Sequence, residues 1–319
     1  MLSKLEMAYG NDKRFEKIKV MKIIAVVVTY NAMTWIDRCL QSLSNSSIAV
    51  LPIVIDNNSQ DGTVNHIAHC YPHVILCPQN ENRGFGQANN IGLEYAIKNG
   101  ADYVLLLNQD AWISRDMLEV LMRFADDKTI LSPKHLNGLG TALDKNFQTF
   151  LLRNLSEQIV STFLTNPQEK AYCVDFVNAA CWLLPINLLL QVGGFNPLFS
   201  HYGEDNQYVQ RVLSIGGHVK VIPSVSVWHD REQFGNKNIF DRGYYYRRFL
   251  LIHAHAKFGF CDYLFVHIRT IVRLIIALLV NKQQAQNIQF AYQLLWNNRS
   301  NIQESKNIEK YQQTPWLKL

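Results

Sequence analysis

Short apolar runs alternate with longer amphipathic stretches through the first third of the chain. The apolar runs 23–28, 53–55 and 103–107 are rich in β-branched residues and leucine, which predicts buried strands. In the stretches 31–43 and 87–100, apolar residues recur at a spacing near 3.6, which predicts helices. This alternation is typical of βαβ units. We therefore predict a mainly parallel, Rossmann-like sheet flanked by helices.

The pattern is less regular in the middle of the chain. At residues 125–170 apolar and polar residues mix without a clear period, and we expect loops and a hairpin there. Regular elements are then expected in this order: strands at 172–177 and 179–184, a helix at 185–192, and strands at 219–222 and 225–227. The predicted helix has proline at its start and glycine after its end, as capping preferences favour.

Polar residues follow each of the first three predicted strands. They are Thr29-Tyr30-Asn31, the segment 56–63, and Asn108-Gln109-Asp110. Because the carboxyl ends of parallel strands meet at the same edge of a sheet, these side chains are expected to lie close together. A carboxylate at such an edge is one way in which α/β proteins hold a metal and a diphosphate.

These strand ends resemble the signature of a known family. T-Y-N at 29–31, D-N-N-S-Q-D-G-T at 56–63, N-R-G-F-G-Q-A-N-N at 82–90 and N-Q-D at 108–110 are similar, in order and spacing, to the family 2 glycosyltransferases of the GT-A fold. The similarity is greatest to bacterial rhamnosyltransferase-like members, which use nucleotide sugars. A later block at 194–211, with an E-D pair opening a helix, resembles the second signature of the same family. The resemblance implies a GT-A fold with a C-terminal helical appendage.

The resemblance implies a nucleotide site at the strand ends. Asp56 would accept the imide N–H of uracil or thymine, and Arg83 would approach the base or the diphosphate. The residues expected to contact the nucleotide are Thr29, Tyr30, Asn31, Asp56, Asn58, Arg83, Gly84 and Asn108. Plainer roles stay open for four of them. Asp56 could cap its own turn, Thr29 or Asn31 the helix that begins near residue 33, and Arg83 could be a solvated surface residue.

The resemblance also implies a metal and a catalytic base. Asp110, with His229 nearby, is expected to hold Mg²⁺ or Mn²⁺ on the diphosphate, although Asn108 replaces the first acidic residue of the family's D-x-D. Asp205 matches the base that removes the proton of the acceptor hydroxyl, and Glu204 and Trp182 are expected to bind the acceptor.

Each of these roles has a structural alternative. Asp110 could cap the helix after Ile113, and His229 could be a buried strand-end histidine. The Glu204-Asp205 pair could simply favour the positive end of the helix dipole. A further acidic residue common in the family is Gln207 here, which leaves one contact on the acceptor side in question.

Three regions are expected along the chain: an N-terminal extension at 1–21, a GT-A catalytic domain at 22–235, and a basic amphipathic helical region at 236–319. The catalytic domain divides into a nucleotide-binding half, 22–124, and an acceptor-binding half, 125–235. Of the 31 Lys and Arg residues, 12 lie in the last region against 4 Asp and Glu, so it carries the basic character of a chain with net charge +5.

The composition indicates a cytoplasmic protein at a membrane surface. The first twenty residues lack the apolar core of a signal peptide, and the six cysteines form no C-x-x-C pair, which favours reduced thiols. The apolar run 264–280 contains Arg269 and Arg273, so we expect an interfacial helix on the inner face of the cell membrane and not a spanning one. A homodimer contact through this apolar face is the alternative. No nucleic-acid partner is expected.

The sequence thus predicts an inverting glycosyltransferase that uses a dTDP- or UDP-sugar, with rhamnose as a candidate, and a glycan or lipid-linked acceptor in cell-surface polysaccharide synthesis. A non-catalytic membrane-associated scaffold of the same fold is a second hypothesis, motivated by Asn108 and Gln207. A sugar-1-phosphate nucleotidyltransferase is a third. That class needs a glycine-rich loop bearing Arg and Lys after the first strand, and residues 29–33 contain none of these.

Overall fold

A computed structural model describes residues 21–200, 202–230 and 243–319 of the chain. Nearly all of the expected N-terminal extension, and the expected boundary at 235–236, lie outside the described residues. The strands are β1 Ile23–Thr29, β2 Val50–Asp56, β3 Ile75–Pro78, β4 Tyr103–Asn108, β5 Ala111–Ile113, β6 Thr129–Asn137, β7 Tyr172–Val174, β8 Cys181–Pro185 and β9 His218–His229.

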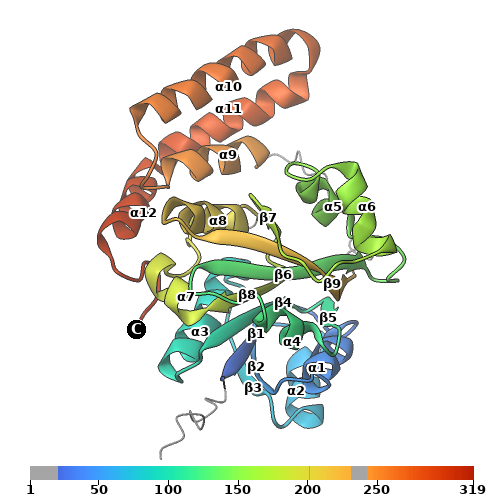
Figure 1. The fold of residues 1–319 in the computed structure, drawn as a ribbon. Coiled ribbons are helices and arrows are strands. Elements are labelled where there is room, and N and C mark those ends of the chain that lie inside the picture. The colour runs from blue at the N-terminus through green and yellow to red at the C-terminus, as the bar shows by residue number, and fades with distance from the viewer. Residues whose placement is uncertain (1–20, 201, 231–242) are drawn as a thin grey trace, which may run out of the picture.

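Twelve helices are described. They are α1 Ile36–Ser44, α2 Thr63–Cys70, α3 Gly84–Lys98, α4 Met117–Met122, α5 Lys145–Leu151, α6 Glu157–Thr165, α7 Ile186–Val192, α8 Glu204–Ser214, α9 Tyr244–His253, α10 Phe260–Val280, α11 Lys282–Asn297 and α12 Arg299–Tyr311. Helices α1 to α8 surround the sheet, and helices α9 to α12 form the C-terminal helical region (Figure 1).

One mixed sheet runs through the molecule in the order β3-β2-β1-β4-β8-β6-β9-β5, with β7 paired to β9. Strands β3, β2, β1 and β4 are parallel, as predicted for the nucleotide-binding half. Strand β8 runs antiparallel to both β4 and β6, and β5 runs antiparallel to β9. The strands from the second half of the chain therefore make the sheet mixed. One of them, β9, pairs with β5, which follows β4 directly in the sequence.

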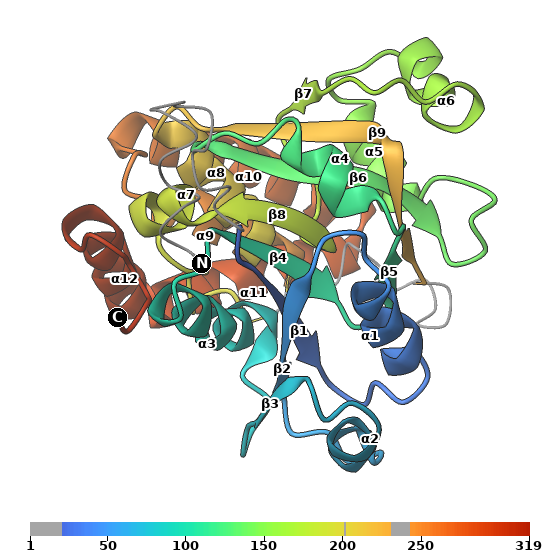
Figure 2. The ribbon, with the colours of Figure 1, turned by 60° about the horizontal axis from the view of Figure 1, so that its bottom comes forward.

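Helices cover both faces of the sheet (Figure 2), and the side chains of β1 alternate between them. Ile24 and Val26 belong to the buried cluster that contains α3, whereas Ile23, Ala25 and Val27 belong to the cluster that contains α1. Burial on both faces explains why β1 is almost continuously apolar. The polar residues of this strand are confined to its end, where they reach the sheet edge.

The prediction of loops and a hairpin at 125–170 is wrong, because β6, α5 and α6 lie there. Almost every residue of β6 is buried, including Ser132, Lys134 and His135. The Lys134 ammonium group donates to the Phe163 carbonyl at 3.0 Å, and the Ser132 hydroxyl lies 2.9 Å from His135 Nε2. Polar side chains satisfied inside a buried strand hide its apolar period. A long strand was therefore indistinguishable from loop.

The two strands expected at 219–222 and 225–227 form one continuous strand, β9. It passes through Pro223, and its pairing with β6 changes register between Pro133 and Lys134. A proline removes one backbone donor, and a shift of register of this kind accommodates it. As a result, β9 is one long strand, and His229 lies at its end.

The C-terminal helices stack on α8. Helix α9 lies next to α8, α11 next to α9, and α10 is the outermost layer (Figure 1). After α12 the chain returns to the sheet domain, where the Gly194 N–H donates to the Pro315 carbonyl at 2.8 Å. The predicted helical appendage is confirmed, and buried contacts join it to the sheet domain.

Candidate active site

The ends of β1 and β2 are joined by one buried carboxylate. Asp56 is fully buried, and its Oδ1 accepts hydrogen bonds from the Thr29 hydroxyl at 2.7 Å and the Ser59 hydroxyl at 2.6 Å. Its Oδ2 accepts from the Ser59 N–H at 2.8 Å. Asp56 therefore does cap its own turn. An ionised carboxylate accepts about four hydrogen bonds, so one place remains for a further donor.

Two asparagines shape the loops beside this carboxylate. Asn31 and Asn58 have positive φ angles of 51° and 65°, a conformation that asparagine tolerates better than most residues. The Asn31 side chain accepts from the Gln60 N–H at 2.8 Å. Helix α1 begins at Ile36 without a side-chain cap, so the alternative in which Thr29 or Asn31 caps it is wrong.

The ends of β1 and β4 are joined by a glutamine. Gln109 Oε1 accepts from the Tyr30 N–H at 2.7 Å, and its Nε2 donates to the Tyr30 carbonyl at 3.2 Å. The side chain thus continues the ladder by one residue. Tyr30 itself is 47% exposed. Its ring is free to face a ligand at the edge where the three strands end.

The start of α3 needs glycine. Gly84 has a φ of 77°, and a Cβ there would lie 2.5 Å from the Ser200 carbonyl oxygen. Asn57, which the sequence did not single out, donates to the Gly84 carbonyl at 3.2 Å and accepts from the Arg83 N–H at 3.2 Å. The Arg83 side chain is 42% exposed and lies 3.5 Å from Glu81.

A shallow cavity of about 370 Å³ opens beside this helix start. It is lined by Glu81, Asn82, Arg83, Gly84, Gln87 and Ser200. Two of the predicted nucleotide-binding residues therefore border a cavity.

The structure brings Asp110 and His229 together. Pairing of β5 with β9 sets Ala111 opposite His229, and His229 Nε2 lies 3.4 Å from Asp110 Oδ1. The Asn108 amide nitrogen lies 3.3 Å from the same His229 nitrogen. Asp116 occupies the N-cap of α4, so the alternative in which Asp110 caps that helix is wrong. His229 is buried, as its structural alternative required.

A second carboxylate, Asp144, lies behind His229 and was not predicted. Its Oδ2 is 3.7 Å from His229 Nδ1, and its Oδ1 accepts from the Phe147 N–H at 2.8 Å as the N-cap of α5. A carboxylate facing the second ring nitrogen of a histidine holds the orientation of the ring. Sequence reasoning missed it because α5 itself was not recognised.

These side chains suit a divalent cation that shares its coordination with a substrate. Within residues 21–200, 202–230 and 243–319, no three His, Cys, Asp or Glu side chains converge as a metal site. Asp110 and His229 offer one carboxylate and one imidazole. Mg²⁺ is commonly held by one or two carboxylates and by the phosphates of the substrate, and Mn²⁺ also accepts oxygen ligands. Asn108 Oδ1 is buried without a hydrogen-bond partner among the described residues. The residues present therefore fit such an ion.

The two acidic residues at the start of α8 differ in their surroundings. Glu204 is 7% exposed, and its Oε2 has no hydrogen-bond partner among the described residues. Burial, with a contribution from the Asp205 charge, raises the pKa of Glu204 to about 8. Asp205 is half-buried, and its Oδ1 accepts from the Asn206 N–H at 2.8 Å. Both lie at the positive end of the helix dipole.

The prediction that Trp182 contacts an acceptor needs correction. Its side chain is fully buried on β8, where its ring stacks 6.5 Å from that of Phe195 and lies 5.9 Å from that of Tyr208. A side chain without exposed surface cannot contact a surface-bound glycan. Trp182 instead packs beneath α8, and thereby supports the helix that carries Glu204 and Asp205.

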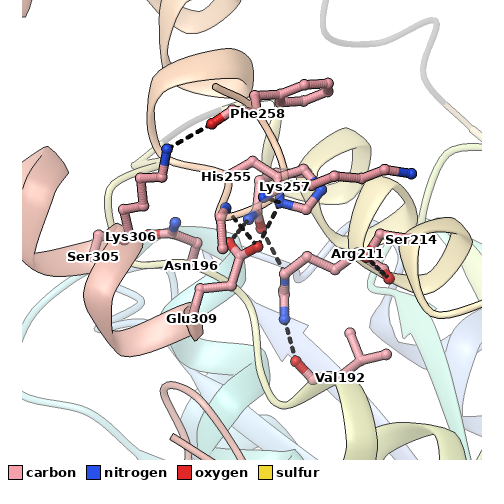
Figure 3. A network of polar contacts seen from close by, with 12 residues as sticks. Val192, Asn196, Arg211, Ser214, His255, Lys257, Phe258, Ser305, Lys306 and Glu309 are labelled. Atoms are coloured by element: carbon pink, nitrogen blue, oxygen red, sulfur yellow. Dashed lines mark hydrogen bonds and ion pairs between the residues drawn. The ribbon is translucent and has the colours of Figure 1, made fainter. Parts of the chain in front are cut away.

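Gln207 has a structural explanation in the C-terminal region. It is fully buried, donates from Nε2 to Glu309 Oε2 at 3.0 Å, and accepts from Arg211 Nε at 3.0 Å. Glu309, from α12, also lies 2.5 Å from His255 Nδ1 (Figure 3). Arg211 donates to the Gly194 carbonyl at 2.5 Å. Gln207 is thus hydrogen-bonded to a carboxylate, that of Glu309, which lies 102 residues further along the chain.

Residues 24–166 match the family model described as Glycosyl transferase family 2. EpsH of Bacillus subtilis, named as a glycosyltransferase, is 31% identical over 109 residues, which are 33% of this chain and 31% of EpsH. The N-acetylglucosaminyl-diphospho-decaprenol L-rhamnosyltransferase of Mycobacterium tuberculosis is 26% identical over 232 residues, which are 65% of this chain and 75% of that protein. The chain therefore spans about a third of the first relative and three quarters of the second.

Solved structures share the fold at low sequence identity. S. aureus TarS in complex with UDP-GlcNAc superimposes with a TM-score of 0.57 and 16% identity, over 91% of this chain and 87% of that chain. The mannosyltransferase PcManGT from Pyrobaculum calidifontis, in complex with GDP-Man and Mn²⁺, gives a TM-score of 0.52 and 16% identity over 92% and 86%. With the family match, these likenesses mean that residues 24–166 match glycosyl transferase family 2, and that the chain has the GT-A fold and resembles proteins named as rhamnosyltransferases.

Proposed function

We propose that the protein is an inverting glycosyltransferase that moves a sugar from a dTDP- or UDP-sugar to a hydroxyl group of a glycan or lipid-linked acceptor. The observation that carries the proposal is the convergence of Asp110 and His229, 3.4 Å apart, at the sheet edge where β1, β2 and β4 also end. Rhamnose is the favoured sugar, because relatives named as rhamnosyltransferases match the chain. The setting is cell-surface polysaccharide synthesis at the cytoplasmic face of the membrane.

The donor nucleotide would lie along the three strand ends. Asp56 is fully buried, so the imide N–H of a pyrimidine would have to enter between the ends of β1 and β2 to reach its remaining acceptor position; Thr29 holds the carboxylate in place. Tyr30 is exposed beside it and offers a ring face to the base. Arg83 borders the cavity at the start of α3 and can donate to a phosphate.

Asp110 and His229 would hold a divalent cation on the diphosphate. Bound there, the ion would neutralise the charge that develops on the leaving nucleoside diphosphate. Asp144, on the far side of the imidazole, would keep His229 turned toward the ion. Asn108 adds no charge, so the site carries a single carboxylate at this strand end.

Asp205 would act as the base. As the acceptor oxygen attacks the anomeric carbon, its proton passes to the Asp205 carboxylate, and the bond from that carbon to the diphosphate oxygen breaks on the opposite face. The configuration at the anomeric carbon is inverted. Glu204, with a pKa of about 8, is largely protonated at neutral pH. It therefore places a hydrogen-bond donor, and not a second negative charge, beside the base.

One of the two observations behind the scaffold hypothesis, Gln207, has a structural explanation. Gln207 is a member of a satisfied buried network with Arg211 and Glu309, so its presence does not indicate a decayed site. The other observation behind that hypothesis, Asn108 at the first position of the D-x-D motif, remains.

Turnover by the Asp205→Asn variant tests the proposal. Release of nucleoside diphosphate from UDP- and dTDP-sugars is measured with a glycan-diphosphate-lipid acceptor, and donor binding is measured separately by thermal stabilisation. Loss of a positioned base is expected to lower kcat by about 10²- to 10⁴-fold with donor binding unchanged. A native protein that binds donor but releases no product, or an Asn variant as fast as the native protein, would overturn the enzyme proposal.

A further inference from the structure

Helix α10 presents an extensive apolar surface to solvent. It is 21 residues long, and it is long and apolar enough to cross a membrane by length and composition. Large apolar side chains along it are between 47% and 83% exposed, among them Leu264, Ile268, Ile271, Val272, Ile275 and Leu279. Soluble proteins rarely leave a continuous apolar surface of this kind uncovered.

The exposed positions form one continuous band. At about 100° per residue, the positions 264, 265, 268, 271, 272, 275, 276, 278 and 279 fill an arc of roughly 160°, and all are apolar. Arg269 and Arg273 lie one turn apart along one edge of this arc. Thr270 and Ala277, which are buried, lie on the opposite side.

Polar contacts within the protein occupy the edge of the arc that lies away from the two arginines. His267 Nε2 lies 3.1 Å from His253 Nε2 of α9, and His267 Nδ1 lies 3.2 Å from the Tyr292 hydroxyl of α11. The Phe249 ring packs 5.3 Å from that of His267. A helix held in this way by α9 and α11 would have to leave these partners to cross a bilayer alone. The contacts favour a helix that lies in the plane of the interface.

Charge distinguishes a lipid surface from a protein partner. Residues 263–303 contain four cationic side chains, Arg269, Arg273, Lys282 and Arg299, and no Asp or Glu. Four of the exposed positions of α11 are glutamines, at 283, 286, 289 and 293; the others are Lys282, Asn297 and one apolar residue, Trp296. The extended apolar face of the hairpin is therefore that of α10, and it is edged by cations. This combination complements anionic headgroups above an acyl layer.

We propose that α10 docks on a bilayer with anionic headgroups, with its apolar arc at the acyl boundary and Arg269 and Arg273 among the phosphates. The inference does not depend on the proposed reaction. Its structural consequence is a fixed orientation, because α9 packs over the start of α8: a Cβ at Gly203 would lie 3.9 Å from Arg247 Cβ. The Glu204-Asp205 end of α8 would then stay at a constant height above the membrane.

Co-sedimentation of the full chain with vesicles tests the docking. We compare vesicles of phosphatidylcholine alone with vesicles that also contain phosphatidylglycerol. The native protein is expected to bind the anionic vesicles more strongly, and added salt is expected to weaken this preference. Ile271→Glu combined with Ile275→Glu is expected to lower the partition coefficient by at least about tenfold.

Two further variants separate the contributions. Leu139→Glu, at a residue that is 76% exposed and outside α10, is the matched control and is expected to bind as the native protein does. Arg269→Gln combined with Arg273→Gln is expected to remove the preference for anionic lipid while leaving the weaker binding to neutral vesicles.

Three outcomes would overturn the proposal. The first is a native protein that binds neither kind of vesicle. The second is a dimer in lipid-free sedimentation equilibrium that the Ile271→Glu, Ile275→Glu variant converts to monomer, because the apolar face would then serve a second copy. The third is native protein that resists extraction from cell membranes by alkaline carbonate, which would indicate a spanning helix.

Discussion

Single carboxylates in this protein have markedly different surroundings. Asp56 is buried but satisfied by three donors, whereas Glu204 is buried with one oxygen unpartnered among the described residues. Asp110 faces an imidazole across 3.4 Å. These differences follow from the partner that each strand or helix end meets. They allow the roles of the carboxylates to be tested one at a time.

Replacing Glu204 by glutamine is expected to change how stability depends on pH. The ordinary pKa of the side chain is 4.5, and burial raises it to about 8 in the folded protein. Between these values the folded state keeps a proton that the unfolded state releases. Rising pH therefore destabilises the native protein by up to about 1.4 kcal/mol per pH unit. Glutamine resembles the protonated acid and does not titrate.

The measurement is urea unfolding of both proteins at about pH 5 and about pH 8. The stability of the Glu204→Gln variant, relative to the native protein, should increase across this range. An equal difference at both pH values would mean that Glu204 is ionised in the folded state. In that case it could not serve as a hydrogen-bond donor beside Asp205.

Removing the Asp110 carboxylate is expected to abolish metal-dependent nucleotide binding. A ligand that binds only the folded state adds about 2.7 kcal/mol of stability at a hundred times its dissociation constant. We expect UDP or dTDP with Mn²⁺ to raise the Tm of the native protein and to have little effect on Asp110→Ala. Asp116→Ala, at an exposed aspartate on α4, is the matched control. A shift of the same size in Asp110→Ala would exclude this carboxylate from the metal site.

Sequence reasoning placed residues well where a strand end fixed them. Thr29 and Asp56 are hydrogen-bonded because the parallel strands β1 and β2 end at one edge, and Asp110 follows β4 at the same edge. Asp144 could not be foreseen, since it reaches His229 from a helix that the pattern did not indicate. Trp182 was misjudged because an apolar strand does not reveal which side chains a later helix covers.

At the level of elements, the nucleotide-binding half was predictable and β6 to α6 were not. Strands β1 and β4 are apolar except at their ends, so burial and pattern agree. Strand β6 buries Lys134 and His135 with their own hydrogen-bond partners, so pattern and burial disagree. Elements that satisfy polar groups internally are therefore the ones that a hydrophobic pattern conceals.

Helix α8 depends on the buried arginine that ties it to its neighbours. Burial lowers the pKa of Arg211 to about 10, so the guanidinium is still charged at neutral pH. Arg211→Met would leave the Gln207 amide and the Gly194 carbonyl without this donor. We expect a loss of about 3 kcal/mol in the free energy of unfolding. Arg123→Met, at a half-exposed ion pair, should cost less than about 1 kcal/mol.

Urea unfolding measures both variants. Equal small losses would show that the Arg211 network contributes little. A kinetic assay adds a second readout, since a displaced α8 should lower kcat while the donor dissociation constant stays the same.

At the scale of the whole molecule, the sheet domain and the C-terminal helices share one interior. The Ser305 hydroxyl donates to Asn196 Oδ1 at 3.0 Å, and the Arg211 guanidinium lies 4.6 Å from the centre of the Trp316 ring. These contacts join α12 and the residues after it to α8 and to the loop before it. The family model ends at residue 166, so the match alone did not foretell this joint interior.

The late position of Glu309 also has a consequence for how the protein is made. Domains can fold as they leave the ribosome, N-terminal part first. Strands β1 to β4 can pair early, since their partners are close in sequence. The carboxylate that completes the surroundings of Gln207 and Arg211, however, belongs to Glu309, which is synthesised 102 residues after Gln207. The sheet would therefore stand assembled well before α8 is secured, and a chain interrupted before α12 would keep the paired strands β1 to β4 while α8 lacked its buried carboxylate partner.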